Sequence, residues 1–366
     1  MKLAIVVGTR PEIIKMAPVV RVCGRMGVNF FILHTGQHYS PNMDRVFFEE
    51  LNLSEPKYNL GIGNMPYNKQ VGRMVIEMKK ILEMEKPDAI VIQGDTTTVL
   101  AAALAASKSG IKIVHLEAGL RSHDVRMLEE INRIAADHIS DYLFTPTERA
   151  SANLLEEGYG KNNIYKVGNS IVDAVLEHRA IADKKSGILE KLGLLPNKYF
   201  LITVHRPENV DYKYKLEEFI RVLEMLKVKY PEYKIVLPLH PRTQKMISAF
   251  SLSLPANIKL IEPLAYLDFL KLQANARLVI TDSGGVQEES CILKVPCVVA
   301  RENTERPESV ELGMSILAGL DTAQIDSAIK RLLLSDINWV NPYGDGTAAG
   351  QMINILIKEL NNNKYV

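Results

Sequence analysis

The sequence around residue 283 has the composition of a phosphate-binding turn. An apolar run, 276–280, is followed by Ser283-Gly284-Gly285 and then by a helical pattern. Two glycines let the backbone approach a ligand closely, and the free N–H groups and positive dipole end of a following helix attract an anion. The same residues also suit an ordinary helix start capped by Ser283 or Asp282. The turn by itself leaves phosphate binding and simple capping open.

Acidic side chains stand where predicted strands end or a helix begins. Asp95 and Glu117 each follow a short apolar run, and Glu129 or Glu130 opens a helical pattern. Each also has a structural explanation, because Asp95 could cap a helix and first-turn glutamates complement the helix dipole. Carboxylates that converge on one site acquire separated pKa values, and such a site can supply both an acid and a base. We therefore predict acid–base chemistry in the N-terminal half.

Cationic and donor side chains follow other predicted strands. Arg10 and Lys15 lie beside a predicted helix start, an unfavourable place for cations unless an anion binds there. His205 and His240 each follow an apolar run in the C-terminal half, and Arg306 lies in a polar loop. These side chains could donate to a diphosphate, Arg306 in a bidentate manner. A solvated lysine and a histidine bonded to one backbone carbonyl are the ordinary alternatives.

The bulk composition excludes several classes of protein. The 366 residues, 47% of them hydrophobic, can fill two cores, and the net charge of +1 without a basic run argues against nucleic-acid and anionic-membrane partners. Dispersed histidines without an H-E-x-x-H motif predict no metal, and Gly8 without further glycines of a G-x-G-x-x-G motif predicts no nicotinamide cofactor. Cys23, Cys291 and Cys297 lie in apolar surroundings without C-x-x-C spacing, and no apolar stretch reaches membrane-spanning length. We expect a cytoplasmic protein with reduced thiols and a small ligand.

The positioning elements are predicted from the alternation of apolar runs with amphipathic stretches. Continuous apolar strands of this kind are buried on both faces, which favours parallel sheets covered by helices. The predicted strands are Leu3–Val7, Phe30–Leu33, Ala89–Ile92, Ile113–His115, Tyr142–Phe144 and Ile164–Val167, then Phe200–Val204, Ile235–Leu237, Ile258–Ile261, Leu278–Ile280 and Cys297–Ala300.

These strands predict an α/β fold with two Rossmann-like, doubly wound domains facing a central cleft. Polar stretches at 183–187 and 193–198 interrupt the pattern and mark the region of the junction. We place the N-terminal domain at 1–170 and the C-terminal, ligand-binding domain at 171–345. A turn-rich segment precedes the last helical pattern, and the final segment, 346–366, is expected to pack back on the first domain.

Taken together and in order, these motifs resemble the non-hydrolysing UDP-N-acetylglucosamine 2-epimerases. The resemblance covers the whole chain, and the ordered combination is far more specific than any single motif. The matching stretches are Gly8-Thr9-Arg10-Pro11-Glu12, Lys15-Met16-Ala17-Pro18, Gly94-Asp95-Thr96-Thr97-Thr98, His115-Leu116-Glu117-Ala118-Gly119-Leu120-Arg121, Glu129-Glu130, Asn132-Arg133, Thr281-Asp282-Ser283-Gly284-Gly285, Thr304-Glu305-Arg306-Pro307-Glu308 and Asn341-Pro342-Tyr343-Gly344-Asp345-Gly346.

The resemblance implies a fold of the GT-B type, a homodimer, and interconversion of UDP-GlcNAc and UDP-ManNAc without metal or nicotinamide. It assigns the catalytic residues Arg10, Lys15, Asp95, Glu117, Glu129 and His205. It also assigns residues that bind the substrate or its UDP group, with Glu289 as an acceptor from a ribose hydroxyl: Arg10, Lys15, His205, His240, Phe269, Ser283, Gly284, Gly285, Glu289 and Arg306.

Two stretches differ from the bacterial members of that family. The segment before Glu129, residues 123–128, is shorter by two residues and poorer in proline and aromatic residues. Gln37-His38-Tyr39-Ser40 differs from the Gln-His-Arg pattern in a region associated there with a second, activating UDP-GlcNAc molecule. The family resemblance, and not this stretch, implies a second UDP-GlcNAc as an allosteric activator. Glu129 and Glu130 both stay candidates for the third carboxylate.

The chemistry of the sugar explains the need for several acids and a phosphate site. The C2–H of an N-acetylhexosamine has no adjacent carbonyl group, so simple enolisation is unavailable. Expulsion of UDP from C1 with loss of the C2 proton gives a 2-acetamidoglucal, to which UDP returns after protonation of the opposite face. A glycosyltransferase, a hydrolysing epimerase and a non-catalytic sensor would also bind a UDP-sugar, but a transferase needs a single base and a sensor needs none.

Overall fold

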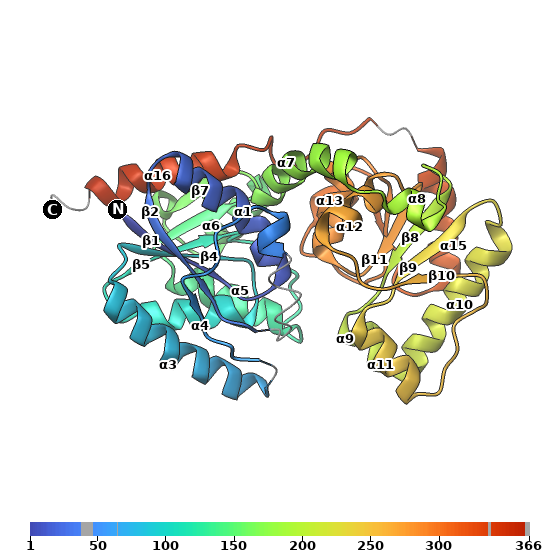
Figure 1. Ribbon diagram of the computed structural model, residues 1–366, viewed down its shortest axis with the longest axis horizontal. Coiled ribbons are helices and arrows are strands. Elements are labelled where there is room, and N and C mark those ends of the chain that lie inside the picture. Colours follow the sequence, from blue (N-terminus) through green and yellow to red (C-terminus); the bar gives the residue numbers. More distant parts are fainter. Residues whose placement is uncertain (38–46, 64, 336–337, 363–366) are drawn as a thin grey trace. The chain divides into compact units, whose positions relative to one another are not determined.

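The computed structural model describes residues 1–37, 47–63, 65–335 and 338–362. The chain forms two compact units: unit 1 comprises Met1–Leu176 and Tyr343–Val366, and unit 2 comprises Glu177–Pro342 (Figure 1). The division falls inside helix α7 (Ser170–Lys185). Each unit is built on its own parallel sheet.

Unit 1 contains a sheet of seven strands within the described residues, in the order β3-β2-β1-β4-β5-β6-β7. Every pair of neighbours is parallel. The strands are β1 (Lys2–Val7), β2 (Asn29–His34), β3 (Tyr58–Asn59), β4 (Ala89–Gln93), β5 (Lys112–Leu116), β6 (Tyr142–Thr145) and β7 (Ile164–Lys166).

Helices cover both faces of this sheet because strand side chains alternate between the faces and nearly all are apolar. Ala4 and Val6 of β1 pack in the cluster that contains Met74 and Val99, whereas helices α1 and α16 pack against each other on the other side (Figure 1). The helices of unit 1 besides α7 are α1 (Arg10–Arg25), α3 (Tyr67–Glu85), α4 (Thr97–Ala106), α5 (Leu128–Ile139), α6 (Glu148–Glu156), the short 3-10 helix η1 (Lys161–Asn163) and α16 (Ala348–Asn362).

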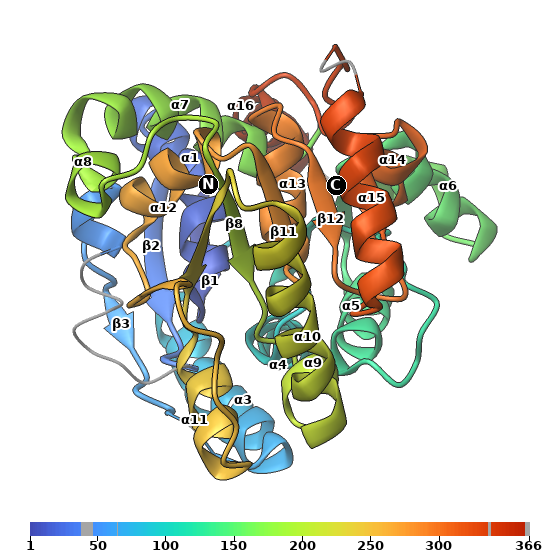
Figure 2. The same cartoon turned by 90° about the vertical axis from the view of Figure 1, so that its right-hand side faces the viewer.

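Unit 2 contains six parallel strands in its described part, in the order β10-β9-β8-β11-β12-β13 (Figure 2). Its strands are β8 (Tyr199–Thr203), β9 (Lys234–Pro238), β10 (Lys259–Ile261), β11 (Leu278–Thr281), β12 (Cys297–Val299) and β13 (Ser315–Leu317). The strand order is that of a Rossmann fold, whose ligands lie beyond the carboxyl ends of the strands where the order reverses. In unit 2 this switch point lies between β8 and β11, and in unit 1 between β1 and β4.

The two faces of the unit 2 sheet have separate cores. Phe200 and Ile202 pack with residues of α10 and α15, whereas Tyr199 and Leu201 pack with residues of α8 and α12. The helices are α8 (Ile188–Leu192), α9 (Pro207–Val210), α10 (Lys213–Lys229), α11 (Pro241–Ala249), α12 (Tyr266–Ala274), α13 (Gly284–Ile292), α14 (Pro307–Glu311) and α15 (Thr322–Leu334).

The predicted α/β class with parallel, helix-covered sheets is confirmed. All of the predicted strands are present with ends within two residues of the predicted ends, but β3 and β13 were missed. Both are short strands of two and three residues with little apolar sequence, Tyr58–Asn59 and Ser315–Leu317. Hydrogen bonds to a neighbouring strand define them, and such pairing leaves no periodic pattern in so short a segment.

The chain returns to unit 1 through a close backbone contact. The N–H of Asn169 donates to the carbonyl of Tyr343 at 2.8 Å, and a Cβ on Gly168 (φ +90°) would lie 3.1 Å from that carbonyl oxygen. The N–H groups of Ala348 and Ala349 donate to the Asp173 carboxylate and so satisfy the start of α16. These contacts fix the start of α7 against the returning chain.

The cysteines match the expectation of reduced core thiols. All three are buried and free, and burial raises the pKa of Cys23 and of Cys297 to about 12. Among the described residues, no helix has both the length and the apolar composition needed to cross a membrane.

Candidate active site

The turn after β1 is held by a buried carboxylate. Glu12 accepts hydrogen bonds from the backbone N–H groups of Gly8 (2.9 Å) and Thr9 (2.7 Å) and from the hydroxyls of Thr9 and Thr96 (2.8 Å each). Burial raises the pKa of Glu12 to about 7, although hydrogen bonds from Thr96 and Thr9 lower it. Because Thr96 follows β4, Glu12 ties together the ends of the two strands at the switch point. Arg10, which starts α1, is half-buried beside this turn.

Glu117 lies in a cluster of donors at the end of β5. Its backbone adopts the left-handed region (φ +64°), and its side chain is 4% exposed. Lys15 forms a buried ion pair with Oε1, the Asn169 amide donates to Oε1 at 2.6 Å, and the Gln93 amide donates to Oε2 at 2.5 Å. The structure thus brings together the predicted Lys15 and Glu117. Gln93 and Asn169 were not predicted, and their only sequence signal is their position at a strand end and at a helix start.

Asp95 forms an ion pair with Arg133 and does not cap the following helix. Thr96 is the N-cap of α4, and its hydroxyl accepts from the N–H of Val99. The capping explanation of Asp95 is therefore wrong, because its carboxylate meets the buried Arg133 guanidinium while its carbonyl accepts from the Asn132 amide at 2.9 Å. The Asp95 side chain stays 24% exposed, so water or a ligand can reach it.

The adjacent Glu129 and Glu130 have different surroundings. Glu130 is 1% exposed, accepts from the N–H groups of Ser122 and His123 at 2.9 Å each, and forms an ion pair with Arg133. It therefore holds the segment before α5 in place. Glu129 is only half-buried on the first turn of α5. Glu129 is thus the more accessible of the two carboxylates left open by the sequence.

A buried polar network supports the segment that carries Glu117. His115 contacts Asp137 through Nδ1 (2.7 Å) and the Gly94 carbonyl through Nε2 (2.8 Å). Arg121 pairs with Asp137 and makes a two-point contact with Glu157 at 2.7 Å per bond. Burial acts to raise the pKa of Asp137, but the facing His115 and Arg121 lower it more. The pKa of Asp137 therefore lies below its usual value. These residues stabilise the backbone on both sides of Glu117.

In unit 2, a buried aspartate holds the first of the predicted histidines. Asp282 accepts at 2.9 Å from the backbone N–H groups of His205 and Arg206, and its Oδ1 lies 3.2 Å from His205 Nδ1. Burial acts to raise the pKa of Asp282, but His205, Arg206 and Asn209 lower it below its usual value. The arrangement directs Nδ1 of His205 towards a carboxylate and leaves its 37%-exposed ring able to donate or accept through Nε2.

The second predicted histidine lies beside the first. The rings of His205 and His240 have centroids 5.0 Å apart. His240 is the N-cap of α11, and its Nδ1 accepts from the N–H of Arg242 at 3.2 Å. Neutral His240 therefore carries its proton on Nε2, where it can donate to an anion.

The Ser-Gly-Gly turn begins α13 as both interpretations require. Ser283 is the N-cap, with its hydroxyl 3.5 Å from the N–H of Val286, and Gly284 starts the helix. A Cβ on Gly284 would lie 2.4 Å from Nη1 of Arg306. Arg306 is 5% exposed, has its Nε 2.7 Å from Glu288 and also pairs with Glu305. In this structure Arg306 packs behind the glycine turn between two carboxylates, and its predicted contact with phosphate stays a prediction.

The remaining predicted binding residues lie on the adjacent helices α12 and α13. Glu289 is buried, and burial together with the nearby Glu289 charge raises the pKa of Tyr266. Phe269 is partly buried against the core that contains Leu272. The structure therefore places Phe269 and Glu289 in unit 2 with Ser283, but shows no role for them in binding.

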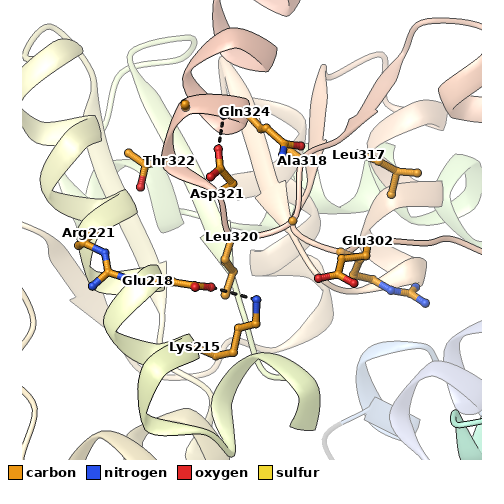
Figure 3. A pocket seen from close by; sticks show the side chains of 13 residues that line it. Lys215, Glu218, Arg221, Glu302, Leu317, Ala318, Leu320, Asp321, Thr322 and Gln324 are labelled. Carbon is orange, nitrogen blue, oxygen red and sulfur yellow. Dashed lines mark hydrogen bonds and ion pairs between the residues drawn. The ribbon is translucent and has the colours of Figure 1, made fainter.

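A cavity of about 590 Å³ in unit 2 lies apart from these residues. Figure 3 shows Lys215 and Glu218 of α10 opposite Asp321 and Gln324 at the start of α15. Lys215 pairs with Glu218 at 3.0 Å, and Asp321 caps α15. None of the residues predicted to bind UDP lines this cavity.

No group of three or more His, Cys, Asp or Glu side chains in the described ranges could hold a metal ion. Of the region linked to a second UDP-GlcNAc, His38, Tyr39 and Ser40 lie outside the described residues. Gln37 is described and buried, and its Oε1 accepts from the N–H (3.0 Å) and the hydroxyl (2.8 Å) of Thr98.

Two Rossmann-like sheets in one chain, with acids at the strand ends of one and a Ser-Gly-Gly helix start in the other, define a nucleotide-sugar enzyme of the GT-B-like class. Solved structures agree. The UDP-GlcNAc 2-epimerase of Methanocaldococcus jannaschii, solved in complex with UDP-GlcNAc and UDP, has a TM-score of 0.93 and 50% identity, covering 98% of this chain and 100% of that chain. The enzyme of Neisseria meningitidis bound to UDP-GlcNAc has a TM-score of 0.90 and 32% identity, covering 98% of this chain and 100% of that chain.

The sequence comparisons identify the family. The model of the UDP-N-acetylglucosamine 2-epimerases matches residues 22–357. A UDP-N-acetylglucosamine 2-epimerase of M. jannaschii is 50% identical over 363 residues, covering 97% of this chain and 99% of the relative. The chain therefore belongs to the UDP-N-acetylglucosamine 2-epimerase family, and it is an isomerase with that epimerase activity.

Proposed function

We propose that the chain interconverts UDP-GlcNAc and UDP-ManNAc by elimination and re-addition of UDP. The observation that carries this proposal is a pair of carboxylates at adjacent strand ends of unit 1. Asp95, after β4, is accessible, and Glu117, after β5, is buried. A single base would be enough to activate an acceptor for glycosyl transfer. Proton removal from one face of C2 and proton return to the other require separate groups.

The chemical steps balance without an external reagent. A carboxylate takes the C2 proton while the bond from C1 to the β-phosphate oxygen breaks, and its electrons leave with UDP, which gives 2-acetamidoglucal. A second protonated group delivers a proton to the opposite face of C2, and the β-phosphate oxygen adds to C1. We assign Asp95, Glu117 and Glu129 to the proton transfers, with Arg10 and Lys15 stabilising the departing charge.

Unit 2 supplies the groups proposed to bind UDP. The start of α13 at Ser283, Gly284 and Gly285 offers backbone N–H groups and a positive helix end for the diphosphate. His205 and His240 can each donate through Nε2, which supports a role in stabilising the leaving phosphate. Phe269, Glu289 and Arg306 complete the binding set, with Glu289 accepting from a ribose hydroxyl.

Incubation with UDP-GlcNAc in D₂O tests the mechanism. The expected result is UDP-ManNAc together with deuterium at C2 of both recovered UDP-sugars, without added metal or NAD and unchanged by EDTA. Free ManNAc as the only product would indicate hydrolysis instead. Epimerised product without deuterium at C2 would refute the elimination mechanism. In that mechanism the acid that returns a proton to C2 exchanges its proton with solvent, so the product must carry the label.

The resemblance supports three finer proposals. The chain is a homodimer, a second UDP-GlcNAc activates it, and its product supplies surface-polysaccharide or glycan synthesis. Sedimentation equilibrium tests whether the chain is a homodimer.

The proposed activation is tested with UDP-ManNAc as the substrate. UDP-ManNAc alone should react slowly until a trace of UDP-GlcNAc is added, and immediate full-rate conversion of pure UDP-ManNAc would contradict activation. For the third, deleting the gene should deplete ManNAc-derived residues from the cell's polysaccharides, and an unchanged sugar composition would contradict it.

A further inference from the structure

We propose that Asn169 and Gln93 are positioning residues that hold the Glu117 carboxylate in its reactive orientation, an inference that rests on the proposed function of Glu117. Each amide donates to a different oxygen of that carboxylate, Asn169 to Oε1 at 2.6 Å and Gln93 to Oε2 at 2.5 Å. Donors on both oxygens restrict rotation of the carboxylate about its terminal bond. Lys15 shares Oε1 with Asn169, but its ammonium group is a point charge on a flexible stem, whereas the two amides donate in fixed directions.

The orientation of the Asn169 amide is itself determined by the backbone. Its Oδ1 accepts from the N–H of Ile171 at 3.0 Å, so the Nδ2 group must face Glu117. The Asn169 N–H donates to the carbonyl of Tyr343, and the residue is 1% exposed. The segment that returns to unit 1 therefore positions the amide, and the amide positions the carboxylate.

Gln93 reaches the same carboxylate from a neighbouring strand. It is the last residue of β4, is 3% exposed, and lies opposite Leu116 in the register of β4 and β5. Glu117 follows Leu116 in the left-handed backbone region, which is unfavourable for a residue with a Cβ. The surrounding donors compensate for this conformation, as expected where backbone strain serves a site.

Steady-state kinetics of Asn169→Ala and Gln93→Ala test the proposal, with Asn153→Ala as the matched control. Asn153 also donates its amide to this segment, but to the backbone carbonyl of Gly119 at 2.9 Å. We expect kcat to fall about 10- to 100-fold in the first two variants, with KM within about twofold, as for groups that orient a catalytic side chain. The control should keep kcat within about twofold. Equal losses in all three variants would indicate a general effect on the segment and overturn the proposal.

A double-mutant cycle separates action through Glu117 from a structural effect. In a Glu117→Gln background, Asn169→Ala should cost no further activity, measured as residual C2 deuterium exchange. A full additional loss would show that Asn169 does not act through Glu117. If Asn169→Ala fails to fold in a thermal-unfolding assay, the same cycle with Gln93→Ala decides the question. An inactive parent protein would instead refute the proposed function, and unchanged kcat in both amide variants of an active parent would refute this inference.

Discussion

The two units use a buried carboxylate in the same topological place with opposite electrostatic results. In unit 1, Glu12 joins the segments after β1 and β4, and in unit 2, Asp282 joins those after β8 and β11. The pKa of Glu12 is raised to about 7 by burial, whereas that of Asp282 is lowered because it faces His205. Strand order thus determines where a linking acid is needed, and its neighbours determine its charge.

The units also differ in what their strand ends present. The ends of β4 and β5 in unit 1 carry carboxylates that meet Arg133 and Lys15. The end of β11 in unit 2 leads into a helix start that packs against the Arg306 guanidinium. One arrangement suits proton transfer and the other suits binding of an anion. The predictions below separate these two tasks.

The largest expected effect is on catalysis by unit 1. Asp95→Asn, Glu117→Gln and Glu129→Gln should each lower kcat by at least roughly 10²-fold, the usual contribution of a positioned acid or base. Binding of UDP, measured by calorimetry, should change less than about threefold. Glu130→Gln serves as the comparison and should mainly lower the melting temperature, because Glu130 holds Ser122 and His123. A nearly wild-type kcat for Glu129→Gln, with a large loss for Glu130→Gln at retained stability, would reverse the assignment.

The next effect is on UDP binding by unit 2. Gly284→Val should weaken the binding of plain UDP, since a side chain there meets Arg306 and blocks the approach of phosphate. Arg306→Ala should weaken it roughly 10- to 100-fold if the guanidinium contributes about 1.5–3 kcal/mol. Calorimetric titration measures both variants. Gly72→Ala is the control, because nothing lies within 4 Å of a Cβ at that helical position.

A double variant distinguishes the two roles of Arg306. Gly284→Ala should destabilise the protein, and the same change in an Arg306→Ala background should destabilise it less, because the clash with the guanidinium is gone and only the closer approach to Glu305 is left. Unchanged UDP affinity in a folded Arg306→Ala protein would limit Arg306 to supporting the turn.

A smaller effect concerns the pH dependence of stability. Because the folded-state pKa of Glu12 is raised, its contribution is complete below about pH 4.5 and is lost as the pH rises through about 7. Glu12→Gln should therefore gain about 2–3 kcal/mol of stability relative to the parent as the pH rises from 5 to 8. Asp282→Asn should instead be less stable than the parent at neutral pH, and this difference should shrink on acidification. The lowered folded-state pKa of Asp282 gives stability that is present above the unfolded-state pKa and is lost as the pH falls. Chemical denaturation across pH measures both, and parallel curves for Glu12→Gln and the parent would contradict the first expectation.

The smallest effect is expected at the cavity near α15. Lys215→Ala removes a partly exposed ion pair with Glu218, which contributes about 0–1 kcal/mol. UDP affinity and kcat should stay within about twofold of the parent values, because no predicted binding residue lines this cavity. A tenfold loss of UDP affinity at retained stability would show that the cavity belongs to the binding site.

Much of the site could be predicted because its residues are local to strand ends. Asp95 and Glu117 in unit 1 and Ser283-Gly284-Gly285 in unit 2 each follow an apolar run, and a parallel sheet places the carboxyl ends of its own strands at one edge. The ion pair between Lys15 and Glu117 and the contact of Asp95 with Arg133 could not be predicted, because their partners are separated by 102 and 38 residues. Arg306 was predicted by type, but its packing against Gly284 depends on how α13 and α14 meet.

By itself, the sequence determined the alternation of strands and helices, the helix start at Ser283 and the acidic strand ends, since each depends on neighbouring residues. Only the tertiary structure decided which acids are buried, which are paired, and that Glu130 rather than Glu129 holds the segment before α5. It also decided that Asn169, 52 residues from Glu117, donates to that carboxylate. The physical reason is that charge, burial and hydrogen-bond partners are properties of the space around a group, and sheet order brings distant segments into that space.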